Sequence, residues 1–105
     1  MLTIRFRAEA GYLTLTMNGH ATGSPAACAG ASALACTLAR YLDWYGAEVK
    51  HTLESGKAQI QCRDAKQVRQ AFELVAVGLA MLAEEHPDKI QLLGRTTGVF
   101  PAGMW

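Results

Sequence analysis

Apolar and polar residues alternate one by one in two runs near the start of the chain, and this alternation constrains the fold more than any other feature. The apolar members of the two runs are Leu2, Ile4, Phe6, Leu13, Leu15 and Met17. Because successive side chains of a β-strand point to opposite faces of the sheet, a period of two predicts strands with one buried face. Residues 8–11 join the two runs, so we expect a hairpin.

The same alternation returns at residues 48–53 and 58–62, with a short turn at residues 54–57 between them. It predicts a second hairpin. A last apolar stretch at residues 90–93 could add a short edge strand. The chain is therefore expected to supply two hairpins to one sheet.

A helix is expected between the two hairpins, from Pro25 to about Tyr45. Ser24 can accept a hydrogen bond from a free N–H at the helix start, and Pro25 suits the first helical position because it has no N–H to leave unpaired. Gly46 can end the helix, since glycine readily adopts the left-handed conformation found there. The first half of this helix is almost entirely small residues, so it can lie very close against a sheet.

A second helix is expected between a cap at Asp64 and Pro87. Its apolar stripe consists of Val68, Phe72, Val75, Leu79 and Leu82. The predicted fold belongs to the α+β class: a small mixed or antiparallel sheet packed against two helices in the order ββαββα, with a possible short last strand. Residues 1–93 are expected to form one domain and residues 94–105, with three glycines and a proline, a flexible tail.

Composition excludes several classes of protein. With 105 residues, the chain can bury one core but is too short for two domains of ordinary size. Its ten Lys and Arg are scattered along the chain and the formal net charge is +1, so we expect no direct binding to nucleic acid or a membrane. Its longest apolar run has ten residues, whereas a membrane span needs about 20. Since no secretory signal is visible either, we expect a soluble, cytoplasmic protein.

Cys28 falls in the first turn of the first predicted helix. Free backbone N–H groups and the helix dipole stabilise a thiolate at such a position. His20 lies eight residues earlier, beyond a glycine-rich loop, so the chain can fold back and bring its ring to the sulfur. Cys28 and His20 together have the composition of a cysteine–histidine dyad, in which the histidine activates the thiol as a nucleophile.

Two further features of the helix start suit this chemistry. First-turn N–H groups near Cys28 could hold the oxyanion that forms when a thiolate attacks a carbonyl. Ser32 lies four residues after Cys28 on the same helix face, where its hydroxyl could hold a substrate group or the base.

A simpler interpretation stands beside the catalytic one. Free cysteine is often a small buried core residue, and Cys28 lies in an alanine-rich segment. Cys36 and Cys62 fit that structural interpretation better. His51, in a predicted strand, is the one rival to His20 as a base, although a packed or hydrogen-bonded role suits it more, and His86 at a helix end is interpreted as structural.

Neither a disulfide framework nor a metal centre is expected. Three cysteines are an odd number, and their irregular spacing favours reduced thiols. The close paired spacing of metal ligands in small zinc modules is missing as well. We therefore expect no cofactor and no metal.

Three separated motifs resemble the ribosomal-processing cysteine protease family, known as Prp. Residues 18–21 read Asn-Gly-His-Ala, and residues 27–34 read Ala-Cys-Ala-Gly-Ala-Ser-Ala-Leu. Members of that family carry a Gly-His-Ala loop followed by a helix that opens with Cys-Ala-(Ala/Gly)-x-Ser-x-Leu. Residues 82–87, Leu-Ala-Glu-Glu-His-Pro, resemble the ending of the family's second helix. The resemblance spans residues 1 to about 93.

The resemblance implies a cysteine endopeptidase. His20 and Cys28 match the catalytic dyad of the family, Ser32 matches a serine that helps to shape the site, and Gly19 and Gly23 belong to the supporting or substrate-binding loop. Family members have a small sheet with two helices and usually form homodimers. Bacterial members remove a short N-terminal extension from a ribosomal protein of the large subunit in ribosome biogenesis, and phage members are thought to process phage head proteins.

The loop between His20 and Cys28 is shorter than in typical members, and Pro25 replaces the usual acidic residue. Substrate choice could therefore differ. The alternative hypothesis is a catalytically inactive, dimeric binding module of the same fold. Thiol redox sensing by Cys28 is a third hypothesis, but it lacks a nearby resolving cysteine.

Overall fold

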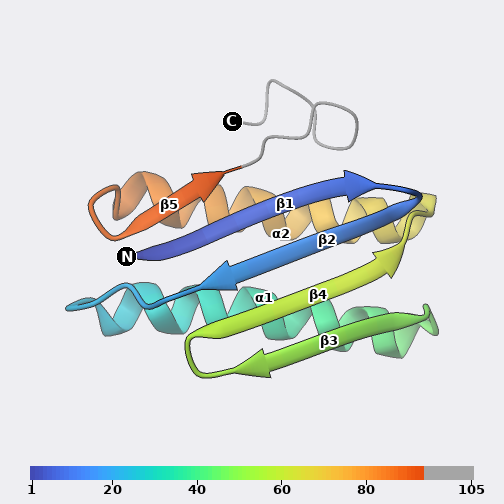
Figure 1. Ribbon diagram of the computed structural model, residues 1–105, viewed down its shortest axis with the longest axis horizontal. Helices are drawn as coiled ribbons and strands as arrows, with labels where there is room; N and C mark the ends of the chain where they lie inside the picture. The colour runs from blue at the N-terminus through green and yellow to red at the C-terminus, as the bar shows by residue number, and fades with distance from the viewer. Residues whose placement is uncertain (94–105) are drawn as a thin grey trace.

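The alternating runs form strands, and the segments of helical spacing cover one face of the resulting sheet (Figure 1). The computed structural model describes residues 1–93. Its elements are β1 (Leu2–Glu9), β2 (Tyr12–Asn18), α1 (Pro25–Tyr45), β3 (Val49–Glu54), β4 (Lys57–Arg63), α2 (Lys66–Glu85) and β5 (Ile90–Leu93). This confirms the predicted α+β class and the short last strand. The flexible tail predicted for residues 94–105 lies outside the described residues.

The sheet is mixed, with the strand order β3-β4-β2-β1-β5. Both hairpins and the β2–β4 pair are antiparallel, whereas β5 runs parallel to β1. β3 is therefore an edge strand, and its end with the β3–β4 turn lies near the start of α1 (Figure 1). The first two of the three sequence motifs, residues 18–21 and 27–34, lie at this corner of the sheet.

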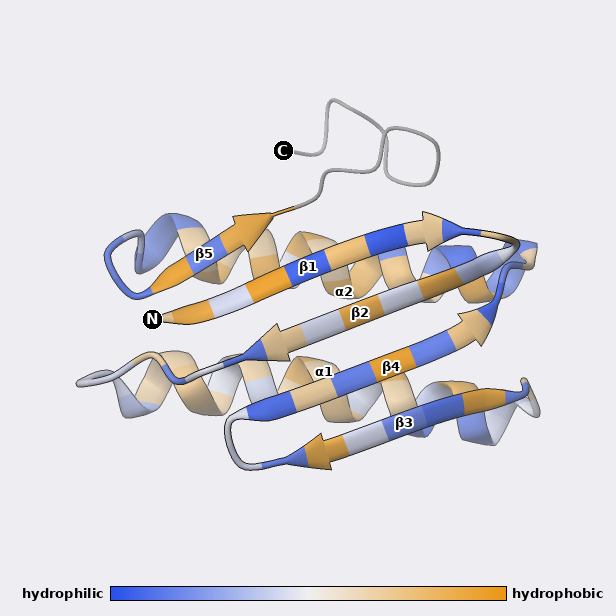
Figure 2. Ribbon diagram, viewed as in Figure 1, coloured by the Kyte–Doolittle hydropathy of each residue, from blue (hydrophilic) through white to orange (hydrophobic). Residues whose placement is uncertain are grey.

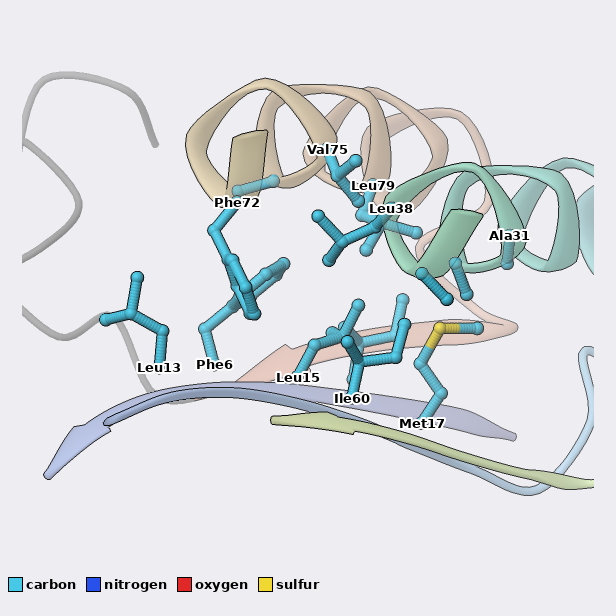
Figure 3. Packing of buried hydrophobic residues seen from close by; sticks show 14 of the residues in the cluster. Phe6, Leu13, Leu15, Met17, Ala31, Leu38, Ile60, Phe72, Val75 and Leu79 are labelled. Carbon is cyan, nitrogen blue, oxygen red and sulfur yellow. The ribbon is translucent and has the colours of Figure 1, made fainter. Parts of the chain in front are cut away.

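The core fills the space between the sheet and the two helices. Every second residue of β1, β2 and β4 points into it, and Figure 2 shows the resulting alternation of hydropathy along these strands. Figure 3 shows these side chains rising from the strands to meet those of α1 and α2. The largest fully buried side chains include Phe6, Leu13, Leu15, Ile60, Leu38, Leu42, Phe72 and Leu79.

The ends of α1 follow the prediction. The Ser24 side chain accepts a hydrogen bond from Ala27 N at 3.3 Å, and Gly46 ends the helix with a φ of 88°. The prediction that Asp64 caps α2 was wrong: the helix begins after Ala65, which makes no side-chain cap bond. Asp64 lies one residue before the cap position, and its carboxylate accepts hydrogen bonds from the Arg69 guanidinium instead, the shorter at 2.6 Å.

Small residues let α1 lie close to its neighbours. Ala27, Ala31 and Ala35 are buried on the side of the helix that faces the sheet. Gly30 packs against α2, where an added Cβ would come within 3.1 Å of the Leu82 side chain. The predicted close approach of this half of the helix is therefore confirmed. No helix among the described residues is both long and apolar enough to cross a membrane.

The close approach predicts how α1 responds to a larger side chain. Ala31→Leu should overpack the layer between helix and sheet and lower the free energy of unfolding by about 1–3 kcal/mol. Ala33→Leu adds the same atoms on the exposed face of the same helix and should change it by less than about 0.5 kcal/mol. Urea unfolding followed by circular dichroism measures both, and equal losses would contradict the packing assignment.

Candidate active site

The loop between β2 and α1 is tied to the turn of the β3–β4 hairpin. The Gly19 N–H donates to the Gly56 carbonyl oxygen at 2.9 Å. Gly19 has a φ of +90°, and a Cβ there would collide with the Met1 carbonyl oxygen. A glycine is therefore required at this position, both for its conformation and for the close passage of the chain start.

A lysine from the other end of the chain holds the middle of the same loop. The Lys89 ammonium group donates to the Thr22 carbonyl oxygen at 2.9 Å. Gly23 lies beside it with a φ of +85°, and an added Cβ would be 3.3 Å from Lys89 Nζ. The backbone of Lys89 is itself fixed, since its carbonyl accepts from Leu2 N–H at the start of the sheet. The loop is thus anchored on two sides.

His20 is exposed, and its ring rests on the turn of the hairpin. A Cβ added to Gly56 would lie 2.8 Å from His20 Nε2, so only a glycine leaves room for the ring in this position. Sequence reasoning predicted the turn around Gly56 but not this contact, because the two residues are 36 positions apart. No local pattern signals it.

Cys28 is half-buried in the first turn of α1. Its thiol lies 3.7 Å from the Ala21 carbonyl oxygen and donates a hydrogen bond to it. Within residues 1–93, no hydrogen bond joins Cys28 to His20. The two side chains instead line the same groove, so the structure brings them together without pairing them.

The groove runs between α1 and the β3–β4 hairpin and has a volume of about 370 Å³. Along α1 its lining passes from Cys28 through Ser32 to Cys36. The facing wall is the end of β3 and the turn, residues 53–58. The lining combines small apolar side chains with a few polar groups, which is typical of a binding cleft.

The first turn of α1 offers fewer free donors than the sequence suggested. Pro25 has no N–H, and the N–H groups of Ala27 and Cys28 donate to the side chain and carbonyl of Ser24. Within the described chain, the Ala26 N–H is the one donor of this turn that makes no hydrogen bond. The Ser32 hydroxyl, in the groove one turn beyond Cys28, also has no hydrogen-bond partner among residues 1–93.

The other two cysteines differ from one another. Cys62 is buried, as predicted, and burial raises the pKa of its thiol, so it stays neutral and unreactive near neutral pH. The expectation that Cys36 is a buried core residue was wrong, since it is exposed. Cys36 lies two turns beyond Cys28 and so faces the groove instead of the sheet.

His51 and His86 lie outside the groove lining. The His51 ring makes a 3.2 Å contact with Asp43 Oδ2, between β3 and α1, so the predicted hydrogen-bonded role is confirmed. His86 ends α2, and its carbonyl accepts from the N–H groups of Lys89 and Ile90. Among residues 1–93, no group of three or more His, Cys, Asp or Glu side chains is arranged to hold a metal ion.

Comparison with known proteins adds a family match. The model of the family described as cysteine protease Prp matches residues 1–91. The fold is similar to the crystal structure of an essential ribosomal processing protease Prp from S. aureus in complex with a covalently linked product peptide, with a TM-score of 0.78 and 21% identity over 90% of this chain and 100% of that one. None of the curated proteins matches the chain.

Two further structures share the fold over the same fractions of both chains. One is the S. aureus protease in complex with a substrate peptide, at 18% identity, and the other a hypothetical protein from Staphylococcus aureus, at 19% identity. Each has a TM-score of 0.70. At these identities, the likeness concerns the fold.

The contact between Gly56 and His20 predicts a local effect of substitution. Gly56→Ala should displace the His20 ring and shift its NMR signals, because the new methyl group would overlap the ring. Gly11→Ala is a matched control: Gly11 also has a positive φ in a hairpin turn, but no atom lies within 4 Å of its added Cβ. Backbone strain is common to both variants, so equal His20 shifts in the two would contradict the contact.

Proposed function

Since this chain belongs to the cysteine protease Prp family, we propose that it is a processing endopeptidase that uses Cys28 as nucleophile and His20 as base. The observation that carries this proposal is that both side chains line one groove at the start of α1. The groove is open along the helix, so a segment of a protein chain can reach both groups.

The chemistry begins by breaking a resting hydrogen bond. The Cys28 thiol donates to the Ala21 carbonyl, so it turns from that oxygen toward His20, and the ring takes its proton. The thiolate sulfur then bonds to the scissile carbonyl carbon, and the ring gives the proton to the departing amine as the C–N bond breaks. Water, deprotonated by the same ring, hydrolyses the thioester and restores the thiol.

The oxyanion requires donors that are not already engaged. The Ala26 N–H and the Ser32 hydroxyl are the unpaired donors nearest Cys28 along α1. The Ser32 hydroxyl lines the groove itself, which favours it as the group that contacts the scissile carbonyl. Donors of this kind typically contribute 10²–10³-fold to the rate.

We propose that the substrate is a protein from which a short N-terminal extension is removed. Two of the structural neighbours from S. aureus are ribosomal processing proteases, one of them in complex with a substrate peptide, which supports a ribosomal protein as substrate. The resemblance of the sequence motifs points to a protein of the large subunit. The groove chemistry suits a phage head protein equally well. Cleavage of each purified precursor, followed by mass spectrometry, distinguishes the two substrates.

Removing either member of the dyad should abolish cleavage without unfolding the protein. We expect Cys28→Ala to lower kcat by about 10³-fold or more and His20→Ala by about 10²–10⁴-fold. Cys62→Ala and His51→Ala are matched controls outside the groove and should keep most of the activity. Peptide cleavage is measured by chromatography and folding by circular dichroism.

The same variants test the alternative function. If Cys28→Ala and His20→Ala complement a deletion in cells as well as the unaltered chain does, the protein acts as a binding module and not as a protease. Loss of complementation together with loss of cleavage supports the protease.

We also propose that the chain forms a homodimer through the outer surface of its helices. Trp44 of α1 and Leu74 and Met81 of α2 are large apolar side chains that are 81%, 74% and 58% exposed. Together with Tyr41, Leu74 also lines an apolar hollow of about 280 Å³ between the two helices. Exposed apolar patches of this kind mark association surfaces, and a second copy would bury both helices at once.

A charge in this patch should disrupt the dimer. Leu74→Glu is expected to shift the mass in solution to that of the monomer, because association would bury an unpaired carboxylate. Gln59→Glu adds the same charge on the opposite face of the sheet and should leave the dimer intact. Multi-angle light scattering measures both, and an unchanged dimer in Leu74→Glu would exclude this surface.

A further inference from the structure

The face of the sheet opposite the helices is bare within the described chain. Both helices lie behind the sheet in Figure 1, and in Figure 3 both lie on the same side of the strands. Outward side chains of β1, β2 and β4 line a shallow concavity of about 800 Å³ on this open face. The centre of this concavity is lined by hydroxyl and amide groups, including those of Thr14, Thr16, Gln59 and Gln61.

Basic residues are concentrated on the open face, and acidic residues on the rest of the described chain. The strand register places five basic residues on the open face: Arg5, Arg7, Lys50, Lys57 and Arg63. Two acidic residues share it, Glu9 and Glu54, and Glu54 is the cross-strand partner of Lys57, so these two charges cancel. The face thus has a formal charge of +3, whereas the remainder of residues 1–93, with four basic and seven acidic residues, has −3.

The spacing of the cations suits a ligand that carries charge along its length. Arg5 and Arg7 lie two residues apart on β1, hence about 7 Å apart. The register row that starts at Arg7 passes through Thr14 and Gln61 and ends at Lys50, three strand spacings or about 14 Å away. Hydrogen-bonding side chains therefore fill the space between the cations. They can contact the backbone of a phosphodiester chain between the phosphates that the cations bind.

An aromatic ring lies within this surface. Tyr12 is 38% exposed, and the Arg63 guanidinium lies 5.6 Å from the centroid of its ring. The arginine covers one side of the ring, so a base can stack on the other side while the guanidinium contacts a phosphate. An acidic protein partner is less suited, because the lining of this concavity consists mostly of charged, hydroxyl and amide side chains and includes no large aliphatic side chain against which an anchor residue could pack.

We propose that the open face binds single-stranded nucleic acid, held chiefly through its phosphates. The expectation that the chain does not contact nucleic acid rested on the scatter of Lys and Arg along the sequence. Alternation along strands spreads basic residues through the sequence, and the sheet gathers five of the nine Lys and Arg of residues 1–93 on one side. Since the catalytic groove lies between α1 and the hairpin, bound nucleic acid and a peptide substrate would occupy different surfaces.

Fluorescence anisotropy with labelled 12-nucleotide oligouridine and oligothymidine tests the proposal on the full chain. We expect both to bind at low salt, and with about four phosphate contacts log K should fall against log salt with a slope of about −3. Equal affinities indicate backbone contacts alone, and tighter binding of the RNA adds contacts to the 2′-hydroxyl. Absence of binding at low salt, or tighter binding of a duplex of equal length, would overturn the proposal.

Arg5→Gln/Arg7→Gln should weaken the affinity at least tenfold while peptide cleavage is unchanged. Arg40→Gln/Lys66→Gln removes the same charge from the helical side and should weaken it less than twofold. Equal losses in the two double variants would mean that net charge and not the open face governs binding. Polyglutamate of matched length is the competitor that tests an acidic protein: if it binds as tightly as the oligonucleotides, the nucleic-acid assignment fails.

Discussion

The close contact between the first half of α1 and the sheet is the constraint on which the rest of the structure depends. Ala27, Ala31 and Ala35 are buried there, and larger side chains would push the helix outward. Because this half of α1 packs against the sheet through small side chains, the start of the helix lies at the corner where β2 ends and the β3–β4 turn begins. Cys28 is thereby brought to the groove that also holds His20.

The loop between β2 and α1 carries His20 and completes the candidate site. It is held by a hydrogen bond to Gly56 at one end and by the Lys89 ammonium group in the middle. Its own Ala21 carbonyl accepts the hydrogen bond of the thiol. In this arrangement the thiol keeps its proton directed at the Ala21 carbonyl, in the same groove that His20 lines.

Local sequence patterns predicted the helices and strands, but they did not predict contacts between residues that are distant in the sequence. Period-two runs, a serine followed by proline and a glycine at a helix end each report on the conformation of a few neighbouring residues, so strands and α1 were predicted almost to the residue. Asp64 was misassigned because its carboxylate could cap a helix or pair with a cation, and the sequence does not rank the two. The support of His20 by Gly56 joins residues in different elements and has no local signature.

The register between β2 and β4 links the groove to the open face. Pairing of Leu15 with Ile60 turns Ile60 into the core and Gln59 outward, and the same register sets where the turn with Gly56 falls. A slip of one residue would bury Gln59 and Gln61 and would also carry Gly56 away from Gly19. The buried pattern of one strand therefore fixes the support of the candidate base on one side of the sheet and the polar surface on the other.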